Sequence, residues 1–234
     1  MVAVTVSREH GALGTEIGHR VADRLGGRYL DRELLDMAFQ FAGLPVPGPA
    51  PLRPSPALEQ KEMPGLARRI VDAIAGPISA GLQPWPRYVP PRPGSVGDED
   101  SLLRQAVATD QAYVDLMSQV LERVLEHYPD SVIVGRGAQC ALAGRPGVLH
   151  VHICATVADR IRRTAQAEGL SESEAADRVH ALDEERAHYI RRYYAEDWQK
   201  PCLYHLTLNT SWLSVDQAVD IILYSAGALG SGQD

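Results

Sequence analysis

The sequence predicts an α/β protein: a three-layer sandwich in which helices cover both faces of a five-stranded parallel sheet. Short apolar runs alternate with helical patterns along most of the chain, which is typical of a parallel sheet. The first apolar run leads directly into a glycine-bearing turn and an amphipathic helix. With 234 residues, 45% of them apolar, the chain can bury one sizeable core. We therefore expect a single domain with one elaboration.

The strands and helices follow from the spacing of apolar residues. Strands are predicted at residues 2–6, 28–30, 131–135, 148–154 and 203–209. Helices are predicted from the first turn to residue 25, and at about 32–42, 100–128, 156–168, 172–197 and 214–226. Ile17, Val21 and Leu25 recur at helical spacing, and a glycine pair follows them as a helix end. Ser171 and Glu174 form a capping box at the start of the long helix at 172–197.

A proline-rich segment interrupts this alternation. Residues 44–97 hold 13 of the 16 prolines, and within them only residues 66–75 suggest a helix. The composition predicts an irregular insertion or flap, and a plain disordered loop explains it equally well. Binding of a protein partner by this segment is a third interpretation.

Charge and cysteine content exclude several classes of partner. The formal charge of -7 lacks the broad positive field of a nucleic-acid-binding protein. Cys140, Cys154 and Cys202 are odd in number and show no C-x-x-C spacing, so neither a disulfide scaffold nor a zinc site is predicted. No apolar run approaches the roughly 20 residues of a membrane span. We expect a cytoplasmic protein without a membrane or nucleic-acid partner; a homo-oligomer is compatible with the sequence.

The turn after the first strand is the first candidate site, because ligands bind at the carboxyl ends of parallel strands. It runs from Ser7 to Gly14, and Gly11 and Gly14 would let the main chain approach a phosphate. Thr15 could present a hydroxyl in the first helical turn. The full signature G-x-x-x-x-G-K-[ST] is absent, so a tight turn without a ligand is an equally good interpretation.

Arginines supply the second candidate, because the chain has 21 of them and only two lysines. Arg136 follows the third strand between two glycines, where a guanidinium could bind phosphate or a base. The helix at 156–168 is expected to bury Val157, Ile161 and Ala165 and to leave other side chains on a different face, namely Arg160 and Arg163. The next helix adds Asp183, Arg186, Arg191 and Arg192. Solvated helix faces explain such arginines about as well as a phosphate-binding lid does.

Two further groups are interpreted as structural. His150 and His152 share one face of a strand without a third metal ligand at suitable spacing. Cys140 lies close to Arg136 and is interpreted as a packing residue.

Taken in order, the blocks of the chain resemble the bacterial cytidylate kinase-like family, which is related to the nucleoside monophosphate kinases of the P-loop superfamily. The blocks are "VTVSREHGALGTEIGHRVADRLGGRYLDRELL", "VIVGRGAQ", "VLHVHICATVADRIRR", "LDEERAHYIRRYYAEDW" and "LTLNTSWLSVDQAVDII". The resemblance covers about residues 2–43 and 100–226 and leaves the proline-rich segment unmatched. It implies a P-loop after the first strand and a helical lid at about 156–198.

The resemblance also implies roles for single residues. Ser7, Gly11, Gly14 and Thr15 match the donor-phosphate loop, with Gly14 at the slot of the catalytic lysine and Thr15 at the slot of the magnesium ligand. Asp31 matches the aspartate after the second strand and Arg136 the arginine that contacts the acceptor nucleotide. Arg160 and Arg163 match lid arginines, and Asp183 with Arg186 is similar to a pair that helps hold the acceptor. Arg160, Arg163 and Arg186 are expected to close over the transferring group, and Asp31 and Asp183 to bind the acceptor. The chain departs from true cytidylate kinases at three places: the lysine slot, Leu13 in place of a loop glycine, and Val134 in place of an acid.

These assignments imply a cytidylate kinase-like phosphotransferase that uses ATP and magnesium to phosphorylate a CMP-like nucleotide or another small acceptor. Arg8 is the nearest cation that could replace the lysine's charge. The alternative is a nucleotide-binding or regulatory protein that keeps the fold without turnover, which the missing lysine favours.

Overall fold

The computed structural model describes residues 2–31 and 110–231. Residues 2–31 and 121–231 form one compact unit, and residues 110–120 belong to a second. The segment at 44–97 and the helices predicted at 32–42 and 66–75 lie outside the described residues.

The five predicted strands form one parallel sheet. They are β1 (Ala3–Arg8), β2 (Arg28–Leu30), β3 (Ser131–Val134), β4 (Val148–Cys154) and β5 (Leu206–Asn209). Their spatial order is β2-β3-β1-β4-β5, and every neighbouring pair is parallel. Because β1 lies at the centre, the loop that follows it emerges in the middle of the carboxyl edge, where ligands of such sheets bind. The predicted parallel α/β sandwich is confirmed.

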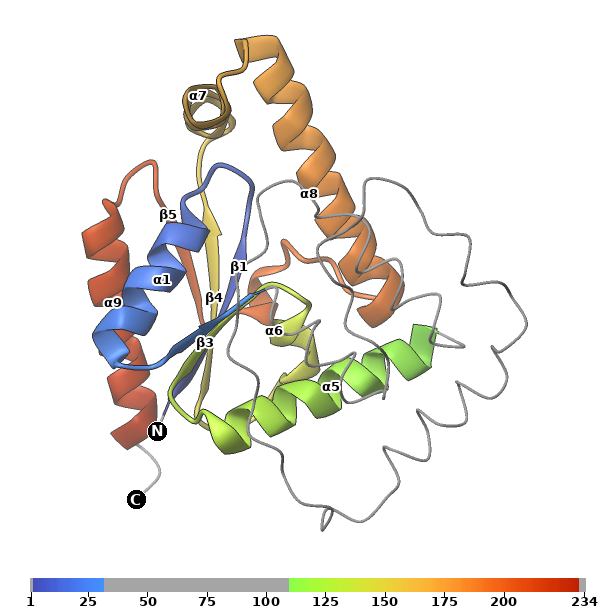
Figure 1. The fold of residues 1–234 in the computed structure, drawn as a ribbon, viewed down its shortest axis with the longest axis vertical. Helices are drawn as coiled ribbons and strands as arrows, with labels where there is room; N and C mark the ends of the chain where they lie inside the picture. Colours follow the sequence, from blue (N-terminus) through green and yellow to red (C-terminus); the bar gives the residue numbers. More distant parts are fainter. Residues whose placement is uncertain (1, 32–109, 232–234) are drawn as a thin grey trace, which may run out of the picture. The chain divides into compact units, whose positions relative to one another are not determined.

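Helices α1 (Gly14–Leu25) and α9 (Val215–Ser231) cover one face of the sheet (Figure 1). Val4 and Val6 of β1 are buried there with Ile17 and Val21 of α1 and Ile222 of α9. The α1 stripe follows from helical spacing, because residues four apart lie on one face. This apolar layer holds the start of α1 against the end of β1.

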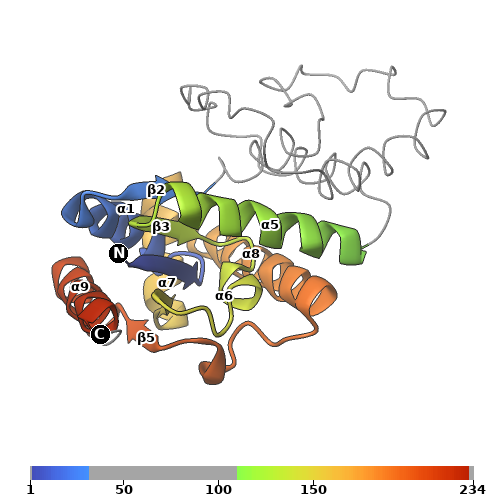
Figure 2. The same cartoon turned by 90° about the horizontal axis from the view of Figure 1, so that it is seen from below.

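The opposite face of the sheet carries α6 (Ala138–Ala141) and the end of α5 (Asp110–His127), as the view from below in Figure 2 shows. Polar side chains are buried on the same side of the sheet. Thr5 Oγ1 lies 2.7 Å from His150 Nδ1, and His150 Nε2 lies 3.2 Å from the Leu142 carbonyl oxygen. The hydroxyls of Ser7 and Tyr204 are 3.1 Å apart, and the Tyr204 ring stacks on His152. His150 and His152 are therefore core residues, as their spacing indicates.

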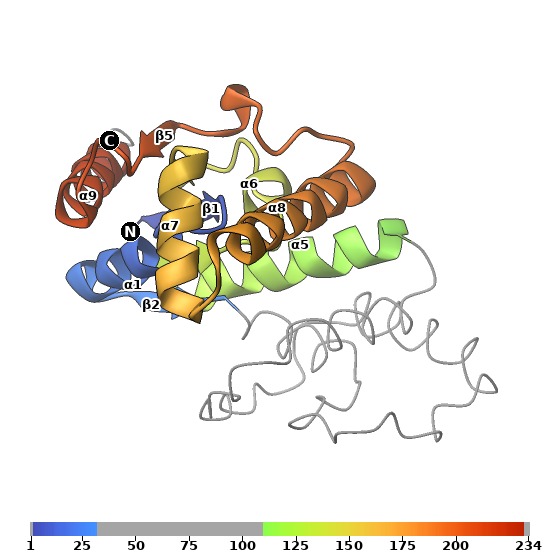
Figure 3. The ribbon, with the colours of Figure 1, turned by 90° about the horizontal axis from the view of Figure 1, so that it is seen from above.

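Helices α7 (Val157–Glu168) and α8 (Glu172–Tyr194) pack on each other above the carboxyl edge (Figure 3). The predicted capping box begins α8: the Ser171 N–H donates to Glu174 Oε2 at 2.9 Å, and the Glu174 N–H donates to Ser171 Oγ at 3.3 Å. Because α7 and α8 lie above the carboxyl edge, they cover the loop that follows β1.

Three local predictions were wrong. The fifth strand begins at Leu206, because Pro201–Leu203 form a 3-10 turn. Helix α8 ends at Tyr194, where the backbone turns left-handed at the following residue. The predicted buried stripe of α7 is not its buried face: Val157 is 57% exposed, whereas Arg160 and Thr164 are buried. The buried face of α7 is polar because acidic groups lie opposite it.

Candidate active site

The loop between β1 and α1 leaves backbone N–H groups open. Gly11 and Leu13 have left-handed backbones, with φ of 77° and 64°, and Leu13 precedes the helix without a side-chain cap. Among the described residues, no hydrogen bond reaches the N–H groups of Gly11, Leu13, Gly14 or Thr15. Uncapped amides at a helix N-terminus form a site for an anion, since they point outward with the positive end of the helix dipole.

A pocket of about 570 Å³ opens over these amides. The loop and the first turn of α1 line it from below, and α7 and α8 line it from above. Four arginines line it, namely Arg8, Arg20, Arg163 and Arg186, together with Thr15, which is exposed. The pocket thus combines open amides with guanidinium groups from β1, α1, α7 and α8.

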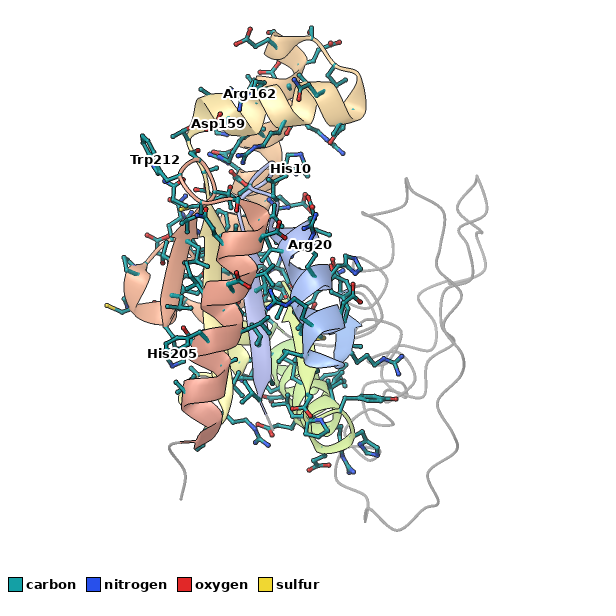
Figure 4. The ribbon with its side chains drawn as sticks, turned by 90° about the vertical axis from the view of Figure 1, so that its left-hand side faces the viewer. His10, Arg20, Asp159, Arg162, His205 and Trp212 are labelled. Atoms are coloured by element: carbon teal, nitrogen blue, oxygen red, sulfur yellow. The ribbon has the colours of Figure 1, made fainter. Side chains whose placement is uncertain are left out.

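Asp183 of α8 fastens the loop to both helices. One carboxylate oxygen accepts from the His10 N–H at 2.8 Å and from Arg186 Nη1 at 2.9 Å, and the other pairs with Arg160 Nη1. Figure 4 shows His10 beneath α7, the helix that carries Asp159 and Arg162. Asp183 and Arg186 are three residues apart, so they share one face of α8. Asp183 therefore fixes the position of the loop and of Arg186 at the same time.

Arg160 is the most buried of the predicted lid arginines, with 7% of its surface exposed. Its Nε lies 3.3 Å from Glu9 Oε2, and its Nη1 pairs with Asp183. The same Glu9 oxygen accepts from the Ala155 N–H at 3.1 Å. A buried guanidinium is stable only when its charge is paired, and these two carboxylates pair it. In this arrangement Arg160 joins α7, α8 and the loop.

Arg163 contacts oxygen atoms of the loops around the pocket. Its Nη1 donates to Thr210 Oγ1 at 3.0 Å and approaches the Gly11 carbonyl oxygen at 3.4 Å, and its Nη2 donates to the Thr210 carbonyl at 2.8 Å. The Thr210 hydroxyl also lies 3.1 Å from the Ala12 carbonyl oxygen. The side chain of Arg163 is thus oriented against the loop without a carboxylate partner among the described residues.

Arg186 lines the same pocket beside Arg8. Burial lowers the pKa of Arg186, and the nearby positive charge of Arg8 lowers it further, while Asp183 opposes both effects. Two guanidinium groups that face one cavity repel each other, and an anion between them relieves that repulsion.

The other predicted residues occupy two further places. Ser7 faces Tyr204 and does not line the pocket. Asp31 follows β2 and pairs with Arg8, with 3.2 Å between Oδ2 and Nη2. Arg136 lies in a turn in which three consecutive residues have left-handed backbones, with φ of 80°, 56° and 69° for Gly135, Arg136 and Gly137. The hydroxyls of Tyr189 and Tyr194 approach the Arg136 carbonyl oxygen at 3.3 and 3.5 Å, which anchors α8 to this turn.

The described residues offer limited ligands for magnesium. Within residues 2–31 and 110–231, no group of three His, Cys, Asp or Glu side chains is placed to hold a metal ion. Mg²⁺ commonly takes few protein ligands and completes its octahedral shell with phosphate oxygens and water. The exposed hydroxyl of Thr15, next to the open amides, fits one such position.

Sequence reasoning missed the residues that hold the site together. Thr164 and Thr210 approach the loop from buried positions, and Glu9 lies in the loop and pairs with Arg160. Each is a single polar residue without a motif, and only its neighbours in space reveal its part. No local signal in the sequence could have identified these residues.

A parallel sheet of this order, with an open glycine-bearing loop after its central strand and a helical lid above it, is the architecture of the P-loop kinases. A model of the cytidylate kinase-like family matches residues 3–212, and the chain belongs to that family. A search of curated proteins returned no match. Among the described residues, none of the helices is both long enough and apolar enough to cross a membrane.

Comparison with solved structures finds similarity at low sequence identity. An uncharacterized protein from Eubacterium ventriosum is 17% identical, with 97% of this chain and 99% of that chain covered and a TM-score of 0.61. A shikimate kinase from Bacteroides thetaiotaomicron is 14% identical, with 97% and 98% covered and a TM-score of 0.47. A gluconokinase from Sinorhizobium meliloti is 11% identical, with 100% and 98% covered and a TM-score of 0.48.

Proposed function

We propose that this protein transfers a phosphoryl group from ATP to a small acceptor, with a CMP-like nucleotide as the first acceptor to test. The observation that carries the proposal is the pocket over the β1–α1 loop, where open backbone amides and four arginines face one cavity. Phosphoryl transfer depends mainly on positioning and on positive charge around the transferring group, and this pocket offers both.

In the proposed reaction the open amides of the β1–α1 loop bind the donor phosphates, and the Thr15 hydroxyl would be one ligand of Mg²⁺; these amides belong to Gly11, Leu13, Gly14 and Thr15. Mg²⁺ would neutralise part of the negative charge on the transferring group. Arg163 and Arg186 bind the phosphate oxygens from the lid side. An oxygen of the acceptor attacks the terminal phosphorus as the bond to the bridging oxygen of ATP breaks, so ADP leaves with the electron pair.

The remaining predicted residues act around this centre. Asp31 and Arg136, which follow β2 and β3, are assigned to the acceptor. Arg160 and Asp183 are assigned as positioning residues, because their charges are paired with each other and with the loop. Together they would hold α7 over the phosphates and exclude water.

A thermal-shift screen of nucleoside mono- and triphosphates, with and without Mg²⁺, followed by a phosphotransfer assay on every stabilising pair, tests the proposal. Arg163→Gln should lower kcat/KM by about 10²-fold or more, because it removes a cation that faces the pocket. Arg162→Gln is the matched control at the neighbouring position of α7: Arg162 is 63% exposed and, among the described residues, pairs with Asp159 alone, so its loss should change activity little. Equal activity of the two variants would contradict the assignment.

The second candidate function is a nucleotide-binding protein without turnover. Gly14 favours it, since a glycine occupies the slot that the resemblance assigns to the catalytic lysine. In that case nucleotides would raise the melting temperature, but no acceptor in a broad panel would be phosphorylated. Absence of any stabilisation by nucleotides would refute both functions.

A further inference from the structure

The side chain of Arg8 crosses the backbone of Gly14. A Cβ atom built on Gly14 would lie 2.4 Å from Arg8 Cβ, 3.0 Å from Arg8 Cγ and 3.4 Å from Ile153 Cβ. Carbon atoms without a bond between them pack at about 3.5–4.0 Å, so the Cβ of Arg8 excludes a side chain at position 14, and the Cγ of Arg8 adds to the clash. The backbone of Gly14 is helical and has no positive φ, so the missing side chain matters here rather than backbone freedom.

The far end of the same side chain passes a second glycine. A Cβ atom on Gly135, just after β3, would lie 2.5 Å from Arg8 Nη1. Beyond it, Arg8 Nη2 reaches Asp31 Oδ2 at 3.2 Å. The lack of side chains at Gly14 and Gly135 therefore leaves room for the Arg8 side chain, and we call this space the passage. Through it Arg8 runs from the end of β1 across the end of β3 towards the end of β2.

Arg8 is held at the border between the loop and these strand ends. It lines the same pocket as Gly14, Thr15 and Arg186, and 18% of its side chain is exposed. A guanidinium with a carboxylate on one side and open amides on the other has donors left for an anion in the pocket.

We infer that Arg8 is the cation that contacts the transferring phosphoryl group, delivered from the end of β1 through the passage between Gly14 and Gly135, and that this route excludes a lysine at position 14. The inference rests on the proposed function for the identity of the anion, whereas the passage itself is a property of the fold. With glycine at position 14, the positive charge beside the transferring phosphoryl group comes from Arg8 of β1 instead of from a lysine at the start of α1.

The steric part is tested by stability alone. Gly14→Ala should lower the melting temperature by roughly 5 °C or more, because the Arg8 Cβ is fixed to the backbone and cannot rotate away. The same substitution made in an Arg8→Gly background should cost far less, since the opposing Cβ is then absent. An Arg8→Ala background should give no such relief, because alanine keeps the Cβ. Equal costs of Gly14→Ala in the wild-type and Arg8→Gly backgrounds would refute the passage.

The chemical part is tested by moving the charge. Arg8→Gly should lower kcat by about 10³-fold, which is the effect of one cation on phosphoryl transfer. Arg8→Gly/Gly14→Lys should recover at least a tenth of the lost rate, whereas Gly14→Lys alone should lose stability. Arg24→Gly is the control for the loss of an arginine of α1 outside the pocket, since Arg24 pairs with Asp220 on the surface.

Affinity for inorganic tripolyphosphate, measured by calorimetry, separates this inference from the proposed function. If the wild-type protein phosphorylates no acceptor, the proposed function fails; Arg8→Gly should still weaken tripolyphosphate binding at least tenfold, and the double variant should restore it. If the wild-type protein turns over and Arg8→Gly keeps kcat within threefold, the inference alone fails. Unchanged tripolyphosphate affinity in Arg8→Gly would also overturn it.

Discussion

Two buried histidines should make this protein lose stability in mild acid. His150 and His152 lie on β4 with 4% and 5% of their surfaces exposed. Burial lowers the pKa of each to about 4, against 6.5 for an exposed histidine, and the neighbouring His205 adds to the shift of His150. The unfolded chain therefore takes up protons at a pH where the folded protein does not.

The direction and size of the change in the free energy of unfolding follow from this difference in pKa between the folded and unfolded states. Stability is full above pH 6.5 and is lost as the pH falls from 6.5 towards 4, because only the unfolded state gains protons in that range. Between pH 7.5 and pH 5.0 each histidine should remove about 2 kcal/mol from the free energy of unfolding, or roughly 4 kcal/mol together. That is a large part of the stability of an ordinary domain.

Urea unfolding at a series of pH values measures this loss. The variant His150→Gln/His152→Gln should have a lower free energy of unfolding at pH 7.5, because it loses packing and the contact of His150 with Thr5, but a flatter pH profile. His180→Gln is the control, since His180 is exposed on α8 and its replacement should leave the slope in place. A double variant whose slope equals that of the wild type would refute the reasoning.

The remaining predictions concern backbone strain, close packing and thiol reactivity. Arg136→Gly should raise the free energy of unfolding by about 1 kcal/mol, because Arg136 has a φ of 56°. The same variant should bind a nucleoside monophosphate more weakly in calorimetry. Leu13→Gly should give a similar gain in stability without that loss of binding. An unchanged or lower stability of both variants would show that these backbones are not strained. Gly11→Ala should lower stability by at least about 2 kcal/mol in urea, because its Cβ would lie 2.7 Å from a carbonyl oxygen of α7 at a φ of 77°, and a neutral result would exclude this packing. In a thiol-reagent assay Cys202, which is exposed, should react first, whereas burial raises the pKa of Cys140 to about 12, so a fast Cys140 would contradict its position.

Local patterns predicted the elements well. Apolar runs located all five strands, helical spacing located α1, and Ser171 with Glu174 marked the start of α8. These signals depend on residues a few positions apart along the chain, so they can be read from the sequence without knowledge of the tertiary structure. The family was also readable, because several blocks in a fixed order are far more specific than one motif, and the family match over residues 3–212 confirms it.

Prediction failed where a residue's environment comes from distant parts of the chain. Val157 was expected to be buried and Arg160 to lie on a different face of the helix, but in the structure Val157 is exposed and Arg160 is buried. The apolar pattern assumes that the interior is apolar. Opposite α7 it is not, because Glu9 and Asp183 lie there and pair with Arg160. Their positions in the sequence, 151 residues before and 23 after, give no hint of this pairing.

The sequence by itself determined the parallel sheet, the glycine-bearing loop after its first strand and the abundance of arginine. Only the tertiary structure decided which arginines face the pocket and which are held by carboxylates. It also showed what a side chain at position 14 would meet, namely the Cβ and Cγ of Arg8. The physical reason is that strands and helices follow from periodicity along the chain, whereas charge pairing and steric exclusion depend on which atoms meet in space.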